Sequence, residues 1–387
     1  MYNIKTYNKI SKSGIEVFDK NRYIISDNAE APVAALVRSA SLHEEKFDDS
    51  LIAIARAGAG TNNIPIERLT DDGIVVFNTP SANANAVKEL TVLGLLLASR
   101  KVVSGIEWAK SLKGNGNDVG KLVEKGKSAF VGPEIRGKKL GVIGLGAIGV
   151  LVANAANNLG MTVIGYDPFI SLQNAWNLSH NIIRANDIKE IYENCDYISL
   201  HVPLNNDTKN TINKAALDSM KDGVRILNFS RDALVNSDDM LLALDSGKVA
   251  CYVVDFPTDE MLGKEGVVCI PHLGASTPES EDNCAVMAAK ELVDYIENGN
   301  IINSVNFPNI SMAKSGFCRI AVIHKNIPNM LTAITSLVAK DNVNIENLLN
   351  KSRGDIAYTL LDIDDCDTET LKKHISALDG VVRVRII

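Results

Sequence analysis

The sequence predicts an α/β protein with two doubly wound parallel sheets, followed by a smaller C-terminal domain of mixed strands and helices. Three observations support this fold class. Short apolar runs alternate with helical segments between residues 13 and 80, and further apolar runs follow a glycine-rich turn at residues 144–149. Residues 317–387 then read strand, helix, strand, strand, helix, strand.

The first domain is expected to hold a parallel sheet, because its apolar runs each end in a turn and alternate with helical segments. These runs are AALVRSA (34–40), LIAIARAG (51–58) and IVVFNTP (74–80). Residues 82–113 follow without a proline and place apolar side chains at helical spacing, which predicts one long helix. The polar, glycine-rich residues 113–121 predict a surface loop.

A second α/β series begins at residue 138, and its order is typical of a Rossmann-like nucleotide-binding sheet. Its predicted strands are residues 140–144, 162–167, 197–202, 224–230, 249–256 and 267–272. A long helix over residues 279–298 should lead the chain back to the first domain. We therefore expect a discontinuous domain of residues 1–96 and 281–310, with residues 97–280 forming the nucleotide-binding domain.

The C-terminal residues 317–387 have the βαββαβ order of a ferredoxin-like domain, and residues 309–316 form the loop that separates it from the rest.

Composition excludes several classes of protein. The net charge of -7 argues against nucleic acid as a main partner, because phosphate binding needs basic stripes. The polar start of the sequence and the lack of a long apolar run predict a cytoplasmic protein without a membrane partner. The six cysteines form no C-x-x-C pair, which predicts free thiols in a reducing compartment and no metal site.

The motif Gly144-Leu145-Gly146-Ala147-Ile148-Gly149 lies between a predicted strand and a predicted helix, the context in which it binds a dinucleotide. Its glycines allow a tight turn and let a pyrophosphate approach the helix N-terminus. Asp167 ends the next strand, where it would bind the ribose hydroxyls and repel a 2′-phosphate, so we expect NAD and not NADP. The alternative is a plain strand-to-helix turn followed by a surface aspartate.

Three further segments lie at the ends of predicted strands: LNFSRDALV (227–235), VDFPTDE (254–260) and IPHLGAST (270–277). Together with the glycine turn they resemble the D-2-hydroxyacid dehydrogenase family, with its arginine, acid and histidine in the same order. The resemblance implies Arg231, His272 and an acid that is Glu260 or Asp259, of which we favour Glu260. Asp232 stands where the family usually has glycine.

The chemistry that the family performs explains these residue types. His272 would take the hydroxyl proton of a 2-hydroxy acid, because a histidine pKa near neutrality suits a reversible general base. A carboxylate would orient the imidazole ring, and Arg231 would hold the substrate carboxylate in its planar fork of donors. The alternatives are a histidine that only satisfies its loop and a surface arginine in a salt bridge.

The same resemblance implies the remaining cofactor contacts. One group should pass the adenine side: His201, Val202, Pro203 and Thr208. A second group should lie near the nicotinamide and its ribose: Asn228, Phe229, Ser230, Asp255 and Gly274.

The first domain should supply the substrate contacts. RAGAGTNNI (56–64) is similar to the family's substrate loop, and the backbone N–H groups of Ala57, Gly58, Ala59 and Gly60 can bind a carboxylate. Residues 37–41 and 78–90 resemble the branch of the family that acts on D-3-phosphoglycerate. That branch implies phosphate contacts from Arg38, Ser39, Asn83 and Lys127, although Arg38 and Lys127 can also be read as solvated surface charges.

Residues 319–334 and 341–348 are similar to ACT domains, small modules that sense amino acids. The resemblance implies an L-serine effector between paired domains, near His324, Asn326 and Asn344. Asn329 replaces a ligand-binding glycine of the family, so the alternative is a pairing module without a ligand.

The expected function is NAD-dependent oxidation of D-3-phosphoglycerate to 3-phosphohydroxypyruvate, the first step of L-serine biosynthesis. Two alternatives remain open. One is a dehydrogenase of another D-2-hydroxyacid, such as glycerate or 2-hydroxyglutarate, and the other is a non-catalytic NAD-sensing protein. We expect a homodimer or a homotetramer.

Overall fold

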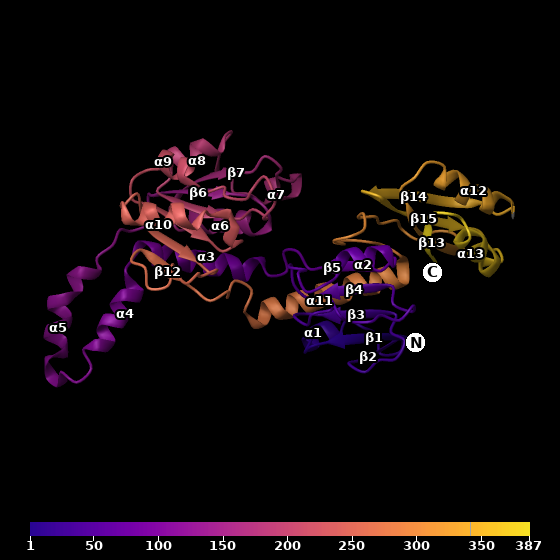
Figure 1. The fold of residues 1–387 in the computed structure, drawn as a ribbon, viewed down its shortest axis with the longest axis horizontal. Coiled ribbons are helices and arrows are strands. Elements are labelled where there is room, and N and C mark those ends of the chain that lie inside the picture. The colour runs from indigo at the N-terminus through magenta and orange to yellow at the C-terminus, as the bar shows by residue number, and fades with distance from the viewer. Residues whose placement is uncertain (341) are drawn as a thin grey trace. The chain divides into compact units, whose positions relative to one another are not determined.

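The computed structural model describes residues 1–340 and 342–387, which divide into two compact units (Figure 1). Unit 1 comprises residues 1–83 and 278–387, and unit 2 comprises residues 84–277. In the part of the chain that the structure describes, no helix is long and apolar enough to cross a membrane.

The predicted α/β class is confirmed, but the structure groups the residues differently from the expected boundaries. The chain leaves unit 1 at residue 83 and not at 96, because the helix that follows packs its buried side chains into the core of unit 2. It returns at residue 278, close to the expected 281. The C-terminal domain belongs to unit 1, because one face of its sheet is buried in the same core cluster as the first sheet.

The first sheet of unit 1 has the order β2-β1-β3-β4-β5, with all strands parallel. Its strands are β1 (Tyr2–Tyr7), β2 (Tyr23–Ser26), β3 (Ala34–Val37), β4 (Ala53–Arg56) and β5 (Val75–Asn78). The short helices α1 (Lys12–Ile15) and α2 (Ile66–Asp71) join them, and the long helix α11 (Pro278–Asn298) contributes Leu292 and Tyr295 to the core. The strand β1, which lies between β2 and β3, was not predicted, because Ile4 is its one buried side chain and it has no apolar pattern.

The sheet of unit 2 has the order β12-β11-β10-β9-β6-β7-β8, again parallel. Its strands are β6 (Lys139–Ile143), β7 (Thr162–Tyr166), β8 (Ile183–Arg184), β9 (Tyr197–Leu200), β10 (Val224–Asn228), β11 (Val249–Val254) and β12 (Val267–Cys269). The connecting helices are α6 (Ala147–Asn158), α7 (Leu172–Asn177), α8 (Ile188–Asn194), α9 (Lys214–Ser219), η3 (Asp232–Leu234) and α10 (Ser237–Asp245). The order reverses between β6 and β9, the point at which such sheets bind ligands.

The helical region before β6 corrects two expectations. The single helix predicted over residues 82–113 is divided into α3 (Ala84–Ser99) and α4 (Val102–Ser111). The break follows Ser99, whose hydroxyl bonds to Leu95 O and Tyr197 OH. Most of the loop predicted at 113–121 is helical, and the elements are η1 (Gly116–Asp118), α5 (Val119–Gly126) and η2 (Lys127–Phe130).

The C-terminal sheet is antiparallel, with the order β14-β15-β13-β16. Its elements are β13 (Cys318–Lys325), α12 (Met330–Lys340), β14 (Ile345–Arg353), β15 (Ile356–Ile363), α13 (Thr368–Ser376) and β16 (Val381–Ile386). Alternate residues of β13 face opposite cores: Ile320 and Val322 pack with the helices, whereas Ala321 and Ile323 join the core of the first sheet.

Candidate active site

The carboxyl ends of the parallel strands of unit 2 lie in register. Their paired last residues are Tyr166, Ile143, Leu200, Asn228, Val254 and Cys269. The residues that come directly after the first five of these strands are Asp167, Gly144, His201, Phe229 and Asp255. The fold therefore brings most of the predicted cofactor residues to one edge of the sheet, where this class of sheet binds its ligands.

The glycine turn requires glycine at two of its three positions. Gly144 has a φ of 92°, and a Cβ there would lie 2.6 Å from the carbonyl oxygen of His201. A Cβ on Gly149 would lie 1.9 Å from the carbonyl oxygen of Gly144. A Cβ on Gly146 meets no protein atom within 4 Å, so protein packing leaves space at the middle glycine. That space is what a pyrophosphate needs to approach the backbone.

The N-terminus of α6 is free for an anion, because no side chain caps it and Gly146 occupies the N-cap position. Asp167 borders the same turn. One of its carboxylate oxygens accepts a hydrogen bond from Leu145 N, and the other accepts one from Phe169 N, both at 2.8 Å. These bonds fix the carboxylate beside the turn and leave acceptor capacity for ribose hydroxyls. These features fit NAD.

The loop after β9 begins with His201, whose Nε2 lies 2.8 Å from Ser199 Oγ. Its Nδ1 is buried without a partner, and burial lowers the pKa of His201 to about 4, so the ring is neutral at physiological pH. The half-buried Val202 follows it, and Thr208 Oγ1 donates to the carbonyl oxygen of Pro203, which closes the loop. The four predicted adenine-side residues therefore belong to one ordered loop.

The loop after β10 is held by buried Asn228. Its side-chain amide donates to Arg231 O at 2.8 Å and its oxygen accepts from Ser230 N. Ser230 Oγ donates to Leu200 O at 2.7 Å, and the Phe229 side chain is buried in the core. Arg231 is exposed, with its Nη1 donating to Ser230 O. The backbone of the arginine is thus fixed, whereas most of its guanidinium donors remain available.

The three neighbouring strands β10, β11 and β12 bring Arg231, Asp255 and His272 together. Asp255 is buried, and neither carboxylate oxygen has a well-formed hydrogen bond. Burial raises the pKa of Asp255, whereas the nearby charges of His272 and Arg231 lower it. His272 itself is exposed, and its ring lies 4.8 Å from the Phe256 ring between centroids. Gly274 is buried, and a Cβ there would lie 3.6 Å from Asp255 Oδ2.

The two acids predicted to partner His272 lie on the segment that follows β11 and Asp255. Asp259 and Glu260 are both exposed, and no hydrogen bond or ion pair in the described structure joins either of them to His272. A hydrogen bond from its own backbone lowers the pKa of Glu260. The charge of His272 acts on the carboxylate of Asp255, a residue that the family resemblance assigns to the nicotinamide side.

In unit 1 the carboxyl ends of the parallel strands also lie in register, with Tyr7, Val37, Arg56 and Asn78 as the paired last residues. The residues that follow β3 and β4 are the predicted Arg38, Ser39, Ala57, Gly58, Ala59 and Gly60. Asn8, at the end of β1, was not predicted. Its side-chain oxygen accepts from Ser39 N and Ala40 N, which orients the loop after β3.

The substrate loop is shaped by Arg56, a second residue that sequence reasoning missed. Gly58 has a φ of 148°, and a Cβ there would lie 2.2 Å from Arg56 Nη1. The Arg56 Nε donates to Arg38 O at 3.1 Å, and Asn78 Nδ2 donates to Ala59 O at 2.6 Å. The position of an arginine directly before a glycine loop was the available sequence signal. The guanidinium lies against the loop and favours an anion there.

The predicted phosphate residues are distributed over both units. Arg38 forms an ion pair with Glu281 of α11 at 2.6 Å, with both side chains partly exposed. Asn83 is half-buried and is the last residue of unit 1. Lys127 lies in unit 2 on η2, where it pairs with Glu124 and is exposed. Among these residues, Arg38 and Ser39 share one loop.

The effector residues predicted in the C-terminal domain differ in exposure. His324 is buried, with its Nδ1 2.8 Å from Lys325 O and its Nε2 2.9 Å from Thr359 Oγ1, so its ring is held inside the sheet. Asn326 and Asn344 are exposed. Asn329 has a φ of 69°, a conformation that glycine and asparagine tolerate, which explains why asparagine can stand in a glycine position.

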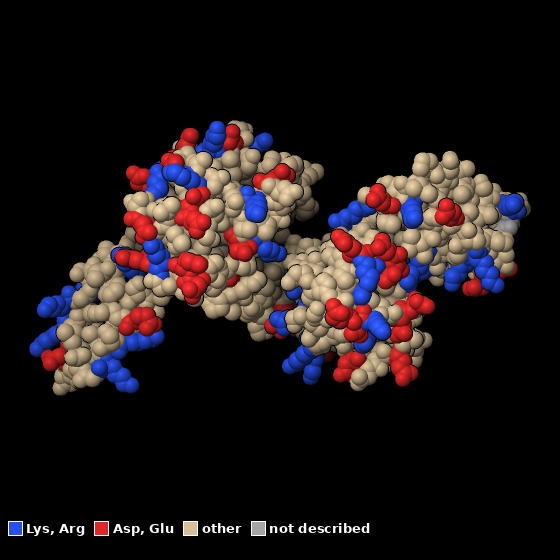
Figure 2. All heavy atoms as spheres, in the orientation of Figure 1, with Lys and Arg blue, Asp and Glu red and all other residues tan. Residues whose placement is uncertain are grey.

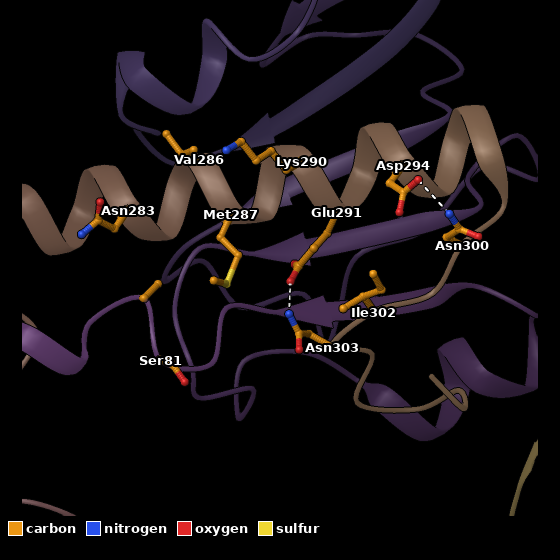
Figure 3. Close-up of a pocket in the computed structure, with 11 residues that line it drawn as sticks. Ser81, Asn283, Val286, Met287, Lys290, Glu291, Asp294, Asn300, Ile302 and Asn303 are labelled. Atoms are coloured by element: carbon orange, nitrogen blue, oxygen red, sulfur yellow. Dashed lines mark hydrogen bonds between the residues drawn. The ribbon is translucent and has the colours of Figure 1, made fainter. Parts of the chain in front are cut away.

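A cavity of about 540 Å³ lies along α11 and contains none of the predicted residues (Figure 3). Glu291 lines it and is 8% exposed. Asn303 Nδ2 donates to Glu291 Oε1 at 2.7 Å, whereas Oε2 is buried without a partner. Burial raises the pKa of Glu291 to about 8. The carboxyl group is therefore mostly protonated at neutral pH.

Comparison with family models identifies two segments. Residues 93–274 match the model described as D-isomer specific 2-hydroxyacid dehydrogenase, NAD binding domain. Residues 320–383 match the model described as AHAS small subunit-like ACT domain.

Curated relatives extend the similarity over most of the chain. D-3-phosphoglycerate dehydrogenase of Haemophilus influenzae is 32% identical, and the alignment covers 87% of this chain and 81% of that protein. The Escherichia coli K12 protein of the same name is also 32% identical, with 88% and 82% covered. The NAD+-bound crystal structure of 3-phosphoglycerate dehydrogenase from Entamoeba histolytica aligns with a TM-score of 0.61 at 25% identity, covering 79% of this chain and 98% of that one.

Proposed function

Because the chain belongs to the D-isomer specific 2-hydroxyacid dehydrogenase family, we propose that it oxidises D-3-phosphoglycerate to 3-phosphohydroxypyruvate with NAD, in L-serine biosynthesis. The names of the two bacterial relatives support this substrate. The structural observation that carries the proposal is the grouping of Arg231, Asp255 and His272 at the ends of neighbouring strands.

Unit 2 would hold the cofactor. The N-terminal amides of α6 and the space beside Gly146 fit the pyrophosphate, and Asp167 fits the adenosine ribose. NAD, when bound, supplies the hydride acceptor for the substrate carbon.

His272 would act as the general base that takes the substrate's hydroxyl proton, and its exposure leaves it free to do so. The ring contact with Phe256 restricts the orientation of the imidazole. Asp255 would stabilise the imidazolium that forms, because a buried carboxylate without other strong partners interacts strongly with a nearby positive charge.

The substrate's two anionic groups need different donors. In unit 2, Arg231 would bind a carboxylate, because the planar guanidinium matches its geometry. In unit 1, the backbone N–H groups of Ala59 and Gly60 would bind an anion, since those of Ala57 and Gly58 already donate to Val37 O and Arg56 O. Arg38 and Ser39 would bind the phosphate. To bind the phosphate, the Arg38 guanidinium must leave its ion pair with Glu281. This exchange costs little free energy, because a partly exposed ion pair contributes little to stability.

An L-serine effector and a homo-oligomer complete the proposal. The ACT match supports an amino-acid ligand, and the exposed Asn326 and Asn344 are its candidate contacts. Because His324 is enclosed by Thr359 and Lys325, we assign it a role in holding the sheet together.

The test is NADH oxidation with 3-phosphohydroxypyruvate, hydroxypyruvate, pyruvate and 2-oxoglutarate, each with and without L-serine. We expect a preference for the phosphorylated keto acid of about 100-fold or more in kcat/KM, because charge-assisted hydrogen bonds to a phosphate contribute about 2–3 kcal/mol. Arg38→Ala should remove most of that preference, mainly through KM.

Lys46→Ala is the matched control, because Lys46 is an exposed cation of the same unit outside the predicted contacts. Equal turnover of all four keto acids would reject the substrate and keep the dehydrogenase. Binding of NADH without turnover of any of them would contradict catalysis and favour an NAD-sensing protein.

A further inference from the structure

A second cavity, of about 690 Å³, lies within unit 1 where the C-terminal domain meets the first sheet. Its walls come from β16, from α13, from the end of α11 and from the segment around Asp49 and Ile52. Its cationic lining residues are Arg22, Lys314, Lys372, Arg383 and Arg385. Its acidic side chains are Asp49 and Glu297.

The two arginines of β16 are held by neutral groups. Arg383 donates to Leu51 O at 2.7 Å and to Asp72 O at 2.9 Å. Arg385 donates to Tyr295 O and Ile296 O in the last turn of α11. These carbonyl oxygens satisfy the guanidinium hydrogen bonds and fix both side chains, but they carry no full negative charge.

The other charged side chains that line the cavity do not neutralise Arg383 and Arg385. Glu297 is already paired with Arg22 at 2.8 Å and also accepts a hydrogen bond from Tyr23 OH. Lys314 donates to Ile387 O at 3.2 Å. Half-buried Lys372 has no ion-pair partner among the described residues, and Asp49 is the acidic side chain of the lining that is not already in an ion pair.

The direction in which the pKa of Arg383 is shifted agrees with an excess of positive charge in the cavity. Burial lowers the pKa of Arg383, and the adjacent Arg385 lowers it further, whereas Asp72 and Asp49 raise it only in part. A positive charge that is partly removed from water and faces another positive charge gains from a nearby anion. Oxyanions with two or more charges accept from guanidinium forks and from ammonium groups.

We propose that this cavity binds a small oxyanion carrying at least two negative charges, such as a phosphate or a polycarboxylate. Lys372 is the direct contact from the C-terminal domain, and Arg383 and Arg385 supply the fixed positive field. The bound anion neutralises charges at the point where the C-terminal domain packs on the first sheet. It thereby stabilises that packing.

The experiment is isothermal titration of the full chain with inorganic pyrophosphate and, in a separate arm, with citrate. Lys372→Gln removes one cation without disturbing an ion pair, and Lys373→Gln is the matched control, because Lys373 is the next residue on α13 and does not line the cavity. Every arm is repeated in Arg38→Ala, which removes the proposed phosphate contact in the active site.

We expect one anion site that survives Arg38→Ala, that weakens about fivefold or more in Lys372→Gln and that changes less than twofold in Lys373→Gln. Binding in the pyrophosphate arm alone would identify the ligand as a phosphate, and binding in the citrate arm alone would identify a polycarboxylate. The proposal is overturned if Lys372→Gln and Lys373→Gln bind alike, or if Arg38→Ala abolishes all binding. Loss of turnover without loss of this site would count against the proposed function only.

Discussion

The two glycine-rich loops of the molecule each follow the carboxyl end of a parallel strand, β6 in unit 2 and β4 in unit 1, yet they are constrained in different ways. In unit 2 the turn is limited by backbone, since Gly149 faces the carbonyl oxygen of Gly144. In unit 1 the loop is limited by a side chain, since Gly58 faces the guanidinium of Arg56 and Gly60 has room. Backbone cannot move aside, whereas a long side chain can change rotamer.

The glycine turn of unit 2 is therefore rigid, whereas the glycine loop of unit 1 can change shape when Arg56 moves. The charges on the visible face are interspersed over both units (Figure 2). The groups that would hold an anion differ, however: the loops of unit 1 offer the arginines Arg56 and Arg38, and the turn of unit 2 offers backbone amides. We therefore expect the turn of unit 2 to respond more strongly to an added side chain than the loop of unit 1.

The largest effect is expected for Gly149→Ala. The added Cβ would lie 1.9 Å from a backbone oxygen, so we expect a loss of about 3 kcal/mol or more in the free energy of unfolding and no measurable NADH binding. Chemical denaturation and NADH fluorescence titration measure the two. Gly146→Ala is the matched control: its Cβ meets no protein atom, so it should keep stability within about 0.5 kcal/mol and weaken only NADH binding. Equal stability of the two variants would show that the turn is not constrained by its backbone.

The next effect is a pH-dependent gain in stability for Glu291→Gln. The folded-state pKa of Glu291 is raised to about 8 from 4.5, so between these values the unfolded chain releases a proton that the folded chain keeps. The wild-type protein therefore loses stability as pH rises from about 4.5 to about 8. Glutamine does not titrate and can keep the bond from Asn303, so the variant should gain on the order of 2 kcal/mol at about pH 6, more at higher pH, and nothing well below pH 4.5.

The measurement is urea denaturation of both proteins at several pH values. Glu279→Gln serves as the control, because Glu279 lies on the same helix and is exposed, and its substitution should give no such trend. A constant difference between wild type and Glu291→Gln across this range would mean that Glu291 is ionised in the folded protein.

The smallest effects are expected in the substrate loop. Gly58→Ala must displace Arg56 and adopt a φ of 148°, so we expect a loss of about 1–2 kcal/mol in stability and a raised KM. Gly60→Ala meets its first neighbour at 3.8 Å and should change stability by less than about 0.5 kcal/mol. Thermal unfolding and steady-state kinetics distinguish them. If Gly58→Ala were as damaging as Gly149→Ala, the loop of unit 1 would be as rigid as the turn of unit 2.

Local sequence patterns determined the fold class, the cofactor turn and the order of elements in the C-terminal domain. These features depend on side-chain periodicity and on glycine at positions that backbone geometry requires, and both can be recognised along the chain. Placing Arg231 and His272 after strands of the same sheet edge also followed from the sequence, because the carboxyl ends of parallel strands meet at one edge.

Only the tertiary structure decided which groups meet across long sequence separations. It buried Asp255 at the end of the strand that lies between those leading to Arg231 and His272, so that the charges of both act on its carboxylate. It buried His324 of β13 against Thr359 of β15, it joined Asn8 to the loop after β3, and it divided the helix predicted over residues 82–113 after Ser99. Each of these results follows from packing between segments far apart in the chain, which no local pattern records.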